Sequence, residues 1–191
     1  MRNWDDNEKP LGYLITFRTY GTWVHGDTRT AVDRFMNKYG QPRIPESPGR
    51  EAYNLQLMKR KPVLLDAKRR RAVHQAIRDV CDHRGWTLRA INIRTNHGHV
   101  VVSADGVSTG MILNAFKANA TRHMREAGCW DSDKTPWVDK GSQRVLWNET
   151  ALAYACDYVI NGQGHDLDDF DSWLKERNPP ATAGGSPSSA R

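Results

Sequence analysis

The strongest structural constraint in this sequence is the run His97-Gly98-His99-Val100-Val101-Val102, in which three valines follow two histidines separated by one residue. Valine favours strands, and successive side chains of a strand point to opposite faces. The run therefore predicts a strand on which His97 and His99 share one face, while Gly98 and the alternate valines share the other. Neutral imidazole is the commonest protein metal ligand, so two imidazoles on one face supply half of a divalent-cation site. The spacing alone also allows two ordinary histidines at a strand end.

A second pattern lies near the C-terminal end of the chain. Residues 148–160 predict a helix with Asn148 as its N-cap. Its buried stripe is expected to be Leu152, Ala155, Cys156 and Val159. Tyr154 and Tyr158 are four residues apart and therefore lie together on another face of this helix.

A His-x-His pair on a strand, followed by a helical tyrosine and a glutamine, resembles the HUH single-tyrosine transposases of the insertion-sequence-200 type and their REP-associated relatives. The matching segments are 96–102 and 158–163, and the resemblance extends over about residues 11–165. Two features depart from the family pattern. Gly98 stands where a bulky apolar residue is usual, which predicts an underfilled inner face. Gln163 follows Tyr158 by five residues rather than by one helical turn.

The resemblance implies a DNA transposase that cleaves and rejoins single-stranded DNA, beside a folded hairpin, through a 5′-phosphotyrosine. Tyr158 would be the nucleophile, with Tyr154 as the alternate. A divalent metal, Mg or Mn, would be held by His97, His99 and Gln163, with His165 as the alternate third ligand. Two other functions stay open: a module of the same fold that binds hairpin nucleic acid without cutting it, and a metal-dependent phosphohydrolase. A homodimer is also compatible with the sequence.

The order of periodic segments predicts the same fold without reference to any family. Strands are expected at 11–20, 86–94, 97–103 and 143–147, and helices at 50–59, 66–84, 108–127 and 148–160, with a loop over 130–142. On the first strand, the face with Tyr13, Ile15 and Phe17 is expected to be separate from the face with Leu14 and Thr16. This order matches a ferredoxin-like split βαβ sandwich of the α+β class, with an antiparallel sheet, helices on one face and the tyrosine helix at the C-terminal end.

Length and composition are those of one domain. The 191 residues, 38% of them hydrophobic, are enough for a single core, which we assign to residues 1–177. Residues 21–65 are rich in Gly, Pro and charge and are interpreted as an insertion, in which Trp23 is more simply a packed side chain than a stacking platform for bases. Residues 178–191 have the composition of a disordered tail.

Charge permits a polyanionic partner, although many basic proteins bind no nucleic acid. The 28 basic side chains exceed the 22 acidic ones, giving a net charge of +6, and basic domains are attracted to phosphate backbones. Seven basic residues on two predicted helices are candidates for DNA contact: Lys68, Arg69, Arg70, Arg71, Lys117, Arg122 and Arg125.

The remaining sequence signals concern location. There is no apolar run of membrane-spanning length, and the segment at 1–6 is not a signal peptide, so a cytoplasmic protein with no membrane partner is expected. The three cysteines are odd in number and far apart, which predicts free thiols rather than disulfides.

Overall fold

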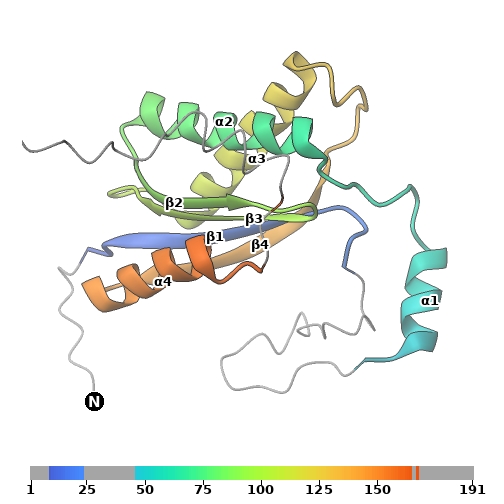
Figure 1. Cartoon of the computed structure of the whole chain (residues 1–191), viewed down its shortest axis with the longest axis horizontal. Helices are drawn as coiled ribbons and strands as arrows, with labels where there is room; N and C mark the ends of the chain where they lie inside the picture. The colour runs from blue at the N-terminus through green and yellow to red at the C-terminus, as the bar shows by residue number, and fades with distance from the viewer. Residues whose placement is uncertain (1–8, 24–45, 165–166, 168–191) are drawn as a thin grey trace, which may run out of the picture.

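A four-stranded antiparallel sheet forms the centre of the protein, as seen in a computed structural model that describes residues 9–23, 46–164 and 167 (Figure 1). The elements in chain order are β1 (Gly12–Thr19), α1 (Pro48–Gln56), α2 (Ala67–Arg84), β2 (Thr87–Ile93), β3 (His97–Ser103), α3 (Thr109–Glu126), β4 (Trp137–Leu146) and α4 (Glu149–Asn161). The strand order is β2-β3-β1-β4. This is the ferredoxin-like α+β arrangement that the sequence predicts.

The helices begin and end where their capping residues predict. Asp66 caps α2 by accepting a hydrogen bond of 2.9 Å from the Arg69 backbone N–H, and Gly85 ends that helix with a φ of 66°. Asn148 caps α4 by accepting from the Ala151 N–H at 2.8 Å. These local signals explain why the predicted boundaries of α2, α3 and α4 agree with the observed ones to within about two residues.

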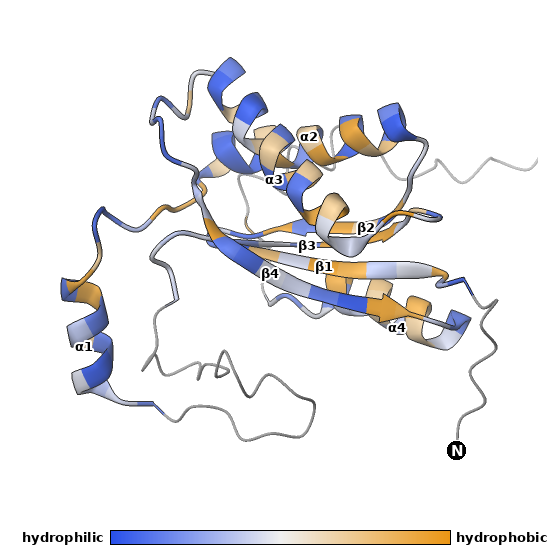
Figure 2. Cartoon of the chain, turned by 180° about the vertical axis from the view of Figure 1, so that it is seen from behind, coloured by the Kyte–Doolittle hydropathy of each residue, from blue (hydrophilic) through white to orange (hydrophobic). Residues whose placement is uncertain are grey.

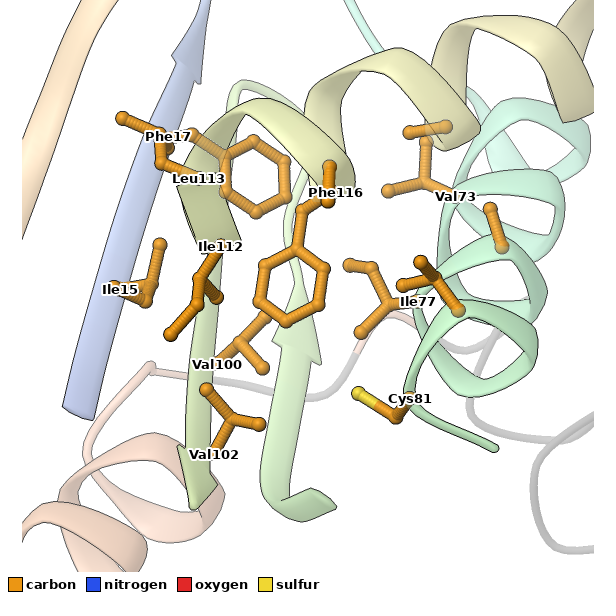
Figure 3. Close-up of a cluster of buried hydrophobic side chains, with 14 of the residues drawn as sticks. Ile15, Phe17, Val73, Ile77, Cys81, Val100, Val102, Ile112, Leu113 and Phe116 are labelled. Atoms are coloured by element: carbon orange, nitrogen blue, oxygen red, sulfur yellow. The ribbon is translucent and has the colours of Figure 1, made fainter. Parts of the chain in front are cut away.

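One face of the sheet is covered by α2 and α3 and forms the main core (Figure 3). Ile15 and Phe17 of β1 pack there with Val100 and Val102 of β3, and Phe116 of α3 lies over them. Phe17 also meets Trp137 edge to face, with ring centroids 5.1 Å apart. The predicted inner faces of β1 and β3 are therefore confirmed.

The opposite face is covered by α4, as the two views in Figures 1 and 2 agree. Leu152, Ala155 and Val159 of α4 pack on Val101 of β3 and Ala90 of β2. Cys156 is only partly buried beside this cluster. The sheet thus has two helices on one face, as expected, and its C-terminal helix on the other.

Strand β4 is longer than predicted, because residues 137–142 belong to it and not to a loop. This half of β4 carries Asp139, Lys140, Gly141 and Ser142, so it lacks the apolar alternation by which a strand is recognised in sequence. It lies at the edge of the sheet, where polar side chains and irregular pairing are common.

Between Phe17 and Thr19 the register of β1 against β4 shifts, so that residues 138–140 of β4 lie opposite Arg18 alone. Such a bulge bends the strand and leaves some of its backbone groups without a cross-strand partner.

Some expectations concern segments outside this core. The helix expected at 50–59 is α1, which buries none of its residues and stands apart from the sheet (Figure 2). Residues 24–45 of the expected insertion, and the whole tail at 178–191, lie outside the described residues. Within the described part of the chain, no helix is long and apolar enough to cross a bilayer.

The inner face beside Gly98 is filled, which overturns the expectation of an underfilled strand. A Cβ at this position would lie 2.7 Å from Cζ of Phe17 and 2.9 Å from Cδ1 of Ile93. Both neighbours are fully buried, so neither can move without disturbing the core. Phe17 and Ile93 supply the volume that a larger residue at position 98 would otherwise provide.

We therefore predict that Gly98→Val lowers the free energy of unfolding by about 1–3 kcal/mol, as overpacked cores do. Urea unfolding of the variant and the parent protein measures the difference. Gly110→Ala is the matched control, because a Cβ there meets no atom within 4 Å and the residue lies in α3. It should be neutral or stabilising by up to about 1 kcal/mol. Equal stability of Gly98→Val and the parent would contradict the packing argument.

Candidate active site

His97 and His99 of β3 share the face of the sheet that α4 covers, as their alternation predicts. Their ring centroids are 4.7 Å apart, with the rings nearly perpendicular. His99 is 7% exposed, whereas His97 is only partly buried at the end of the strand. The pair therefore combines one ring held inside the structure with one ring near the surface.

Hydrogen bonds at Nδ1 orient both rings. Nδ1 of His97 lies 2.6 Å from Oδ1 of Asn96, and because that oxygen can only accept, Nδ1 is the protonated nitrogen. Nδ1 of His99 lies 2.8 Å from Oγ1 of Thr16, a hydroxyl that can accept or donate. Asn96 therefore selects the tautomer in which Nε2 of His97 carries the lone pair that a metal requires, and Thr16 permits the same tautomer of His99 when its hydroxyl accepts from Nδ1.

Burial holds His99 in its neutral form. Burial, together with the charge of the neighbouring His97, lowers the pKa of His99 to about 4. A neutral imidazole is the form that binds metal ions, so the environment of His99 prepares it as a ligand at neutral pH.

A row of polar side chains crosses the sheet at the level of His99. Asn92 of β2 and Thr16 of β1 are the direct cross-strand partners of His99. Ser142 of β4 pairs with Thr16 and extends the row to the edge strand. Directly paired residues point to the same face of an antiparallel sheet. The row therefore lies on the α4 side, next to the apolar patch formed by Leu14, Val101 and Ala90.

Tyr158 is the tyrosine that α4 brings to the histidines. Its ring meets His99 edge to face with centroids 5.5 Å apart, and 39% of the residue is exposed. Tyr154, one turn earlier, is 69% exposed. Tyr158 is thus in contact with His99 and accessible from outside.

Hydrogen bonds at the C-terminal end of α4 hold Tyr158 over the sheet. Nδ2 of Asn92 donates to the backbone carbonyl of Val159 at 3.0 Å. The carbonyl of Tyr158 accepts from the Gly162 N–H and from Nε2 of Gln163, both at 3.0 Å. These donors satisfy carbonyls that every helix leaves free at its end.

Gly162 allows the chain to turn tightly at this point. A Cβ at this position would lie 2.7 Å from the Tyr158 carbonyl oxygen. The turn lets Gln163 fold back onto the helix, although it follows Tyr158 by five residues. The hydrogen bond uses the amide nitrogen of Gln163, and the ligand atom of an amide would be its oxygen Oε1.

The metal donors that the structure describes are few. Among residues 9–23, 46–164 and 167, no three His, Cys, Asp or Glu side chains are grouped as a metal site. His97 and His99 are adjacent, oriented and, in the case of His99, neutral, so they fit a cation that binds nitrogen. His165 lies outside the described residues, and the roles of Gln163 and His165 as third ligand stay predictions.

The basic residues that the sequence offers for DNA contact lie on α2 and α3, which cover the face opposite the histidines. Arg70 is 3% exposed and donates to the Leu65 carbonyl at 3.0 Å. Arg69 donates to the carbonyls of Cys129 and Leu64 at 3.0 and 2.8 Å. Both guanidinium groups therefore bind backbone carbonyls near α2, and Arg70 is buried although the sequence names it as a candidate for DNA contact.

Lys117 is also an internal residue, only 8% exposed. Its ammonium group donates to the carbonyls of Val138, Asp139 and Lys140 at 2.8, 2.8 and 3.1 Å. These are the bulged residues of β4, so Lys117 satisfies carbonyls at the irregular part of the sheet edge. The predicted contact of Lys117 with DNA is therefore replaced by a structural role. For Lys68, Arg71, Arg122 and Arg125 it stays a prediction.

Sequence reasoning missed the residues that surround the histidines on neighbouring strands. Thr16 and Asn92 orient His99 and α4, and Arg18 is the direct cross-strand partner of His97. Arg144 of β4 pairs with Leu14 and lies on the same face. The alternation of β1 already groups Thr16 with Arg18, but only the pairing register shows which residue each one faces.

A family model described as "Transposase IS200 like" matches residues 55–154, a range that includes both histidines and ends before Tyr158. A solved structure of a REP-associated tyrosine transposase bound to a REP hairpin is similar over 79% of this chain, with 12% identity and a TM-score of 0.43. The chain matches 65% of that protein's length. No curated protein sequence matched.

We predict that Lys117→Met lowers the free energy of unfolding by about 2–4 kcal/mol, because carbonyls of the β4 bulge lose their donor in a buried site. Methionine keeps the chain as far as Cε, with sulfur in place of Cδ, and lacks the ammonium group. Chemical unfolding measures the loss, with Arg122→Met on the exposed side of α3 as a control that should change little. If the Lys117→Met variant were as stable as the parent protein but bound DNA more weakly, Lys117 would contact DNA instead of supporting the bulge.

Proposed function

Because the chain belongs to the IS200-like family of transposases, we propose that it cleaves and rejoins single-stranded DNA with Tyr158 as the nucleophile. The observation that carries the proposal is the contact between the Tyr158 ring and His99, at a centroid distance of 5.5 Å. The ring is partly exposed, so a strand could reach the phenol. A strand running beside folded hairpin DNA is the substrate that we propose, and the net charge of +6 favours such a partner.

The proposed reaction is a transesterification. The phenolic oxygen of Tyr158 forms a bond to the scissile phosphorus, and the bond from that phosphorus to the 3′ oxygen of the preceding nucleotide breaks. The phenol loses its proton and the departing 3′ oxygen gains one, which leaves a 5′-phosphotyrosine and a free 3′-hydroxyl. Attack of another 3′-hydroxyl on the phosphotyrosine reverses the step and joins two ends without ATP.

His97 and His99 would hold a divalent cation through Nε2, and Oε1 of Gln163 or a nitrogen of His165 would complete the protein ligands. When bound, such a cation offsets the charge that develops on the oxygens of the scissile phosphate. Imidazole ligands favour Mn over Mg, which prefers oxygen. Asn96 and Thr16 would keep both rings oriented by their hydrogen bonds to Nδ1.

Asn92 would act on the nucleophile rather than on the ligands. Its bond to the Val159 carbonyl joins the end of α4 to β2, directly beside the residue that carries the phenol. Small displacements of reacting groups reduce rates strongly, so this attachment would help to keep Tyr158 in reach of a phosphate held at the histidines.

We predict that Tyr158→Phe abolishes covalent attachment to DNA, because it removes the attacking oxygen and keeps the ring. Binding of the single strand should persist, and stability should change little for a partly exposed hydroxyl. The measurement is a denaturing gel after incubation with labelled single strands, including those that flank its own gene, in the presence of Mn²⁺. A labelled band of the size of the protein reports the covalent complex.

Tyr154→Phe is the matched control, since it removes the same hydroxyl one turn earlier on the same helix and should keep adduct formation. Loss of the adduct in Tyr154→Phe alone would transfer the role to Tyr154. Cleavage without an adduct in the parent protein would indicate a phosphohydrolase. Tight binding with neither cleavage nor adduct would indicate a module that binds hairpin nucleic acid without cutting it.

We predict that His97→Ala and His99→Ala each weaken the binding of Mn²⁺ by at least about tenfold, as the loss of a ligand or of its support does. Calorimetric titration of the protein without DNA measures this directly. His123→Ala is the control, because His123 lies on α3 beside Asp79 and should not affect the affinity. An affinity that is the same in all three variants would rule out the histidine pair as the metal site.

A further inference from the structure

We infer that Arg18 and Trp23 form a stacking subsite for one base of a single-stranded nucleic acid, next to His97. The inference extends the proposed function, on which it rests, because it assigns a place to the strand that would enter the site. The guanidinium carbon of Arg18 lies 4.6 Å from the centroid of the Trp23 ring. Both side chains are partly exposed, so Trp23 is not the simply packed side chain that the sequence alone favours.

The position of Arg18 connects this pair with the histidines. Arg18 is the direct partner of His97 in the antiparallel pairing of β1 with β3, so both side chains leave the sheet on the α4 side. It also lies opposite the β4 bulge, a kind of irregularity that often directs a side chain toward a functional site. A strand with a phosphate at the histidines would pass directly over Arg18.

The turn that carries Trp23 is well supported. The Thr19 backbone N–H and hydroxyl both donate to the Asn96 carbonyl, at 2.9 and 3.0 Å. The Thr22 hydroxyl donates to the Thr19 carbonyl at 3.0 Å. Gly21 allows the turn, with a φ of 73° and no room for a Cβ beside Pro62. Asn96 therefore binds both the turn and the first histidine, because its backbone carbonyl accepts from Thr19 and its Oδ1 accepts from His97.

Neighbouring contacts tie the same turn to two further segments. The Tyr20 N–H donates to the Pro136 carbonyl at 2.8 Å, and the Tyr20 carbonyl accepts from the Val63 N–H at 2.8 Å. The guanidinium of Arg60 lies 4.1 Å from the Tyr20 ring centroid and forms a second pair of arginine and aromatic ring. The turn is therefore a preformed support and would need little ordering when a ligand binds.

The chemistry of the pair suits a base and its phosphate. An aromatic ring stacks on the face of any base, and an arginine beside it adds attraction to the phosphate backbone. Proteins that hold single strands without reading their sequence combine these two groups. A double helix keeps its bases stacked on one another, so Trp23 would favour a single strand.

The chain offers a matched control on the opposite face. Arg69 lies 5.7 Å from the Trp130 ring centroid, in a pair of the same composition. There Arg69 binds the carbonyls of Leu64 and Cys129, and Trp130 donates to the Lys134 carbonyl at 3.1 Å. Trp130 thus belongs to a structural pair that the sheet separates from the histidines.

The test measures the affinity of the full chain for a labelled oligothymidylate single strand. Trp23→Leu should weaken binding about 5- to 100-fold, the range expected when one stacked base is lost. It should leave the salt dependence unchanged, because no charge is removed. Trp23→Phe should recover part of the affinity, and Trp130→Leu should bind like the parent protein. Arg18→Gln should lower the slope of log affinity against log salt by about 0.7.

Photocrosslinking of the unmodified protein provides a second measurement that needs no variant. A strand containing 5-bromouracil should crosslink to the peptide that contains Trp23. The inference is overturned if Trp23→Leu binds like Trp130→Leu, or if crosslinks form elsewhere and not at Trp23. Either of these two results, combined with formation of the Tyr158 adduct by the parent protein, would leave the proposed function standing and refute the subsite alone. A parent protein that binds no single strand would refute both.

Discussion

The pairing of β3 between β1 and β2 is the constraint on which the other features depend. A strand that is paired on both edges cannot shift by one residue without exchanging its two faces. Val100 and Val102 are held toward the core of α2 and α3, so His97 and His99 must lie on the opposite face. The same pairing places Thr16 and Asn92 beside His99, which makes a polar row where α4 ends.

The two faces of the sheet have different roles. The face toward α2 and α3 is a dry core, and the basic side chains nearest to it bind backbone carbonyls. Lys117 shows this most clearly, since its charge is used within the protein to satisfy the bulge of β4. The face toward α4 is apolar beneath Leu152, Ala155 and Val159 and polar in the row of residues paired with His99. An exposed phenol, two imidazoles and Arg18 can therefore meet at one place.

The end of α4 links the stability of the fold to its chemistry. Val159 is fully buried, whereas the adjacent Tyr158 lies against His99 and is partly exposed. The helix is held there by Asn92 from β2 and by the turn at Gly162. Gln163 caps the helix through its amide nitrogen, which keeps its oxygen near the end of the helix that carries Tyr158. A longer spacing between tyrosine and glutamine is thus compatible with an ordered helix end.

Local patterns in the sequence determined the elements and their faces, because alternation, helical periodicity and capping act between residues close in the chain. These patterns predicted which face of β3 carries the histidines, where α2 begins and ends, and which side of α4 is buried. They could not give the first half of β4, whose polar residues are strand only because β1 pairs with them, or the burial of Arg70 and Lys117. The filled space at Gly98, and the neighbours of the histidines, also depended on register and on contacts between distant segments. Such contacts are decided by packing in three dimensions, where Phe17 occupies the volume beside a glycine 81 positions later.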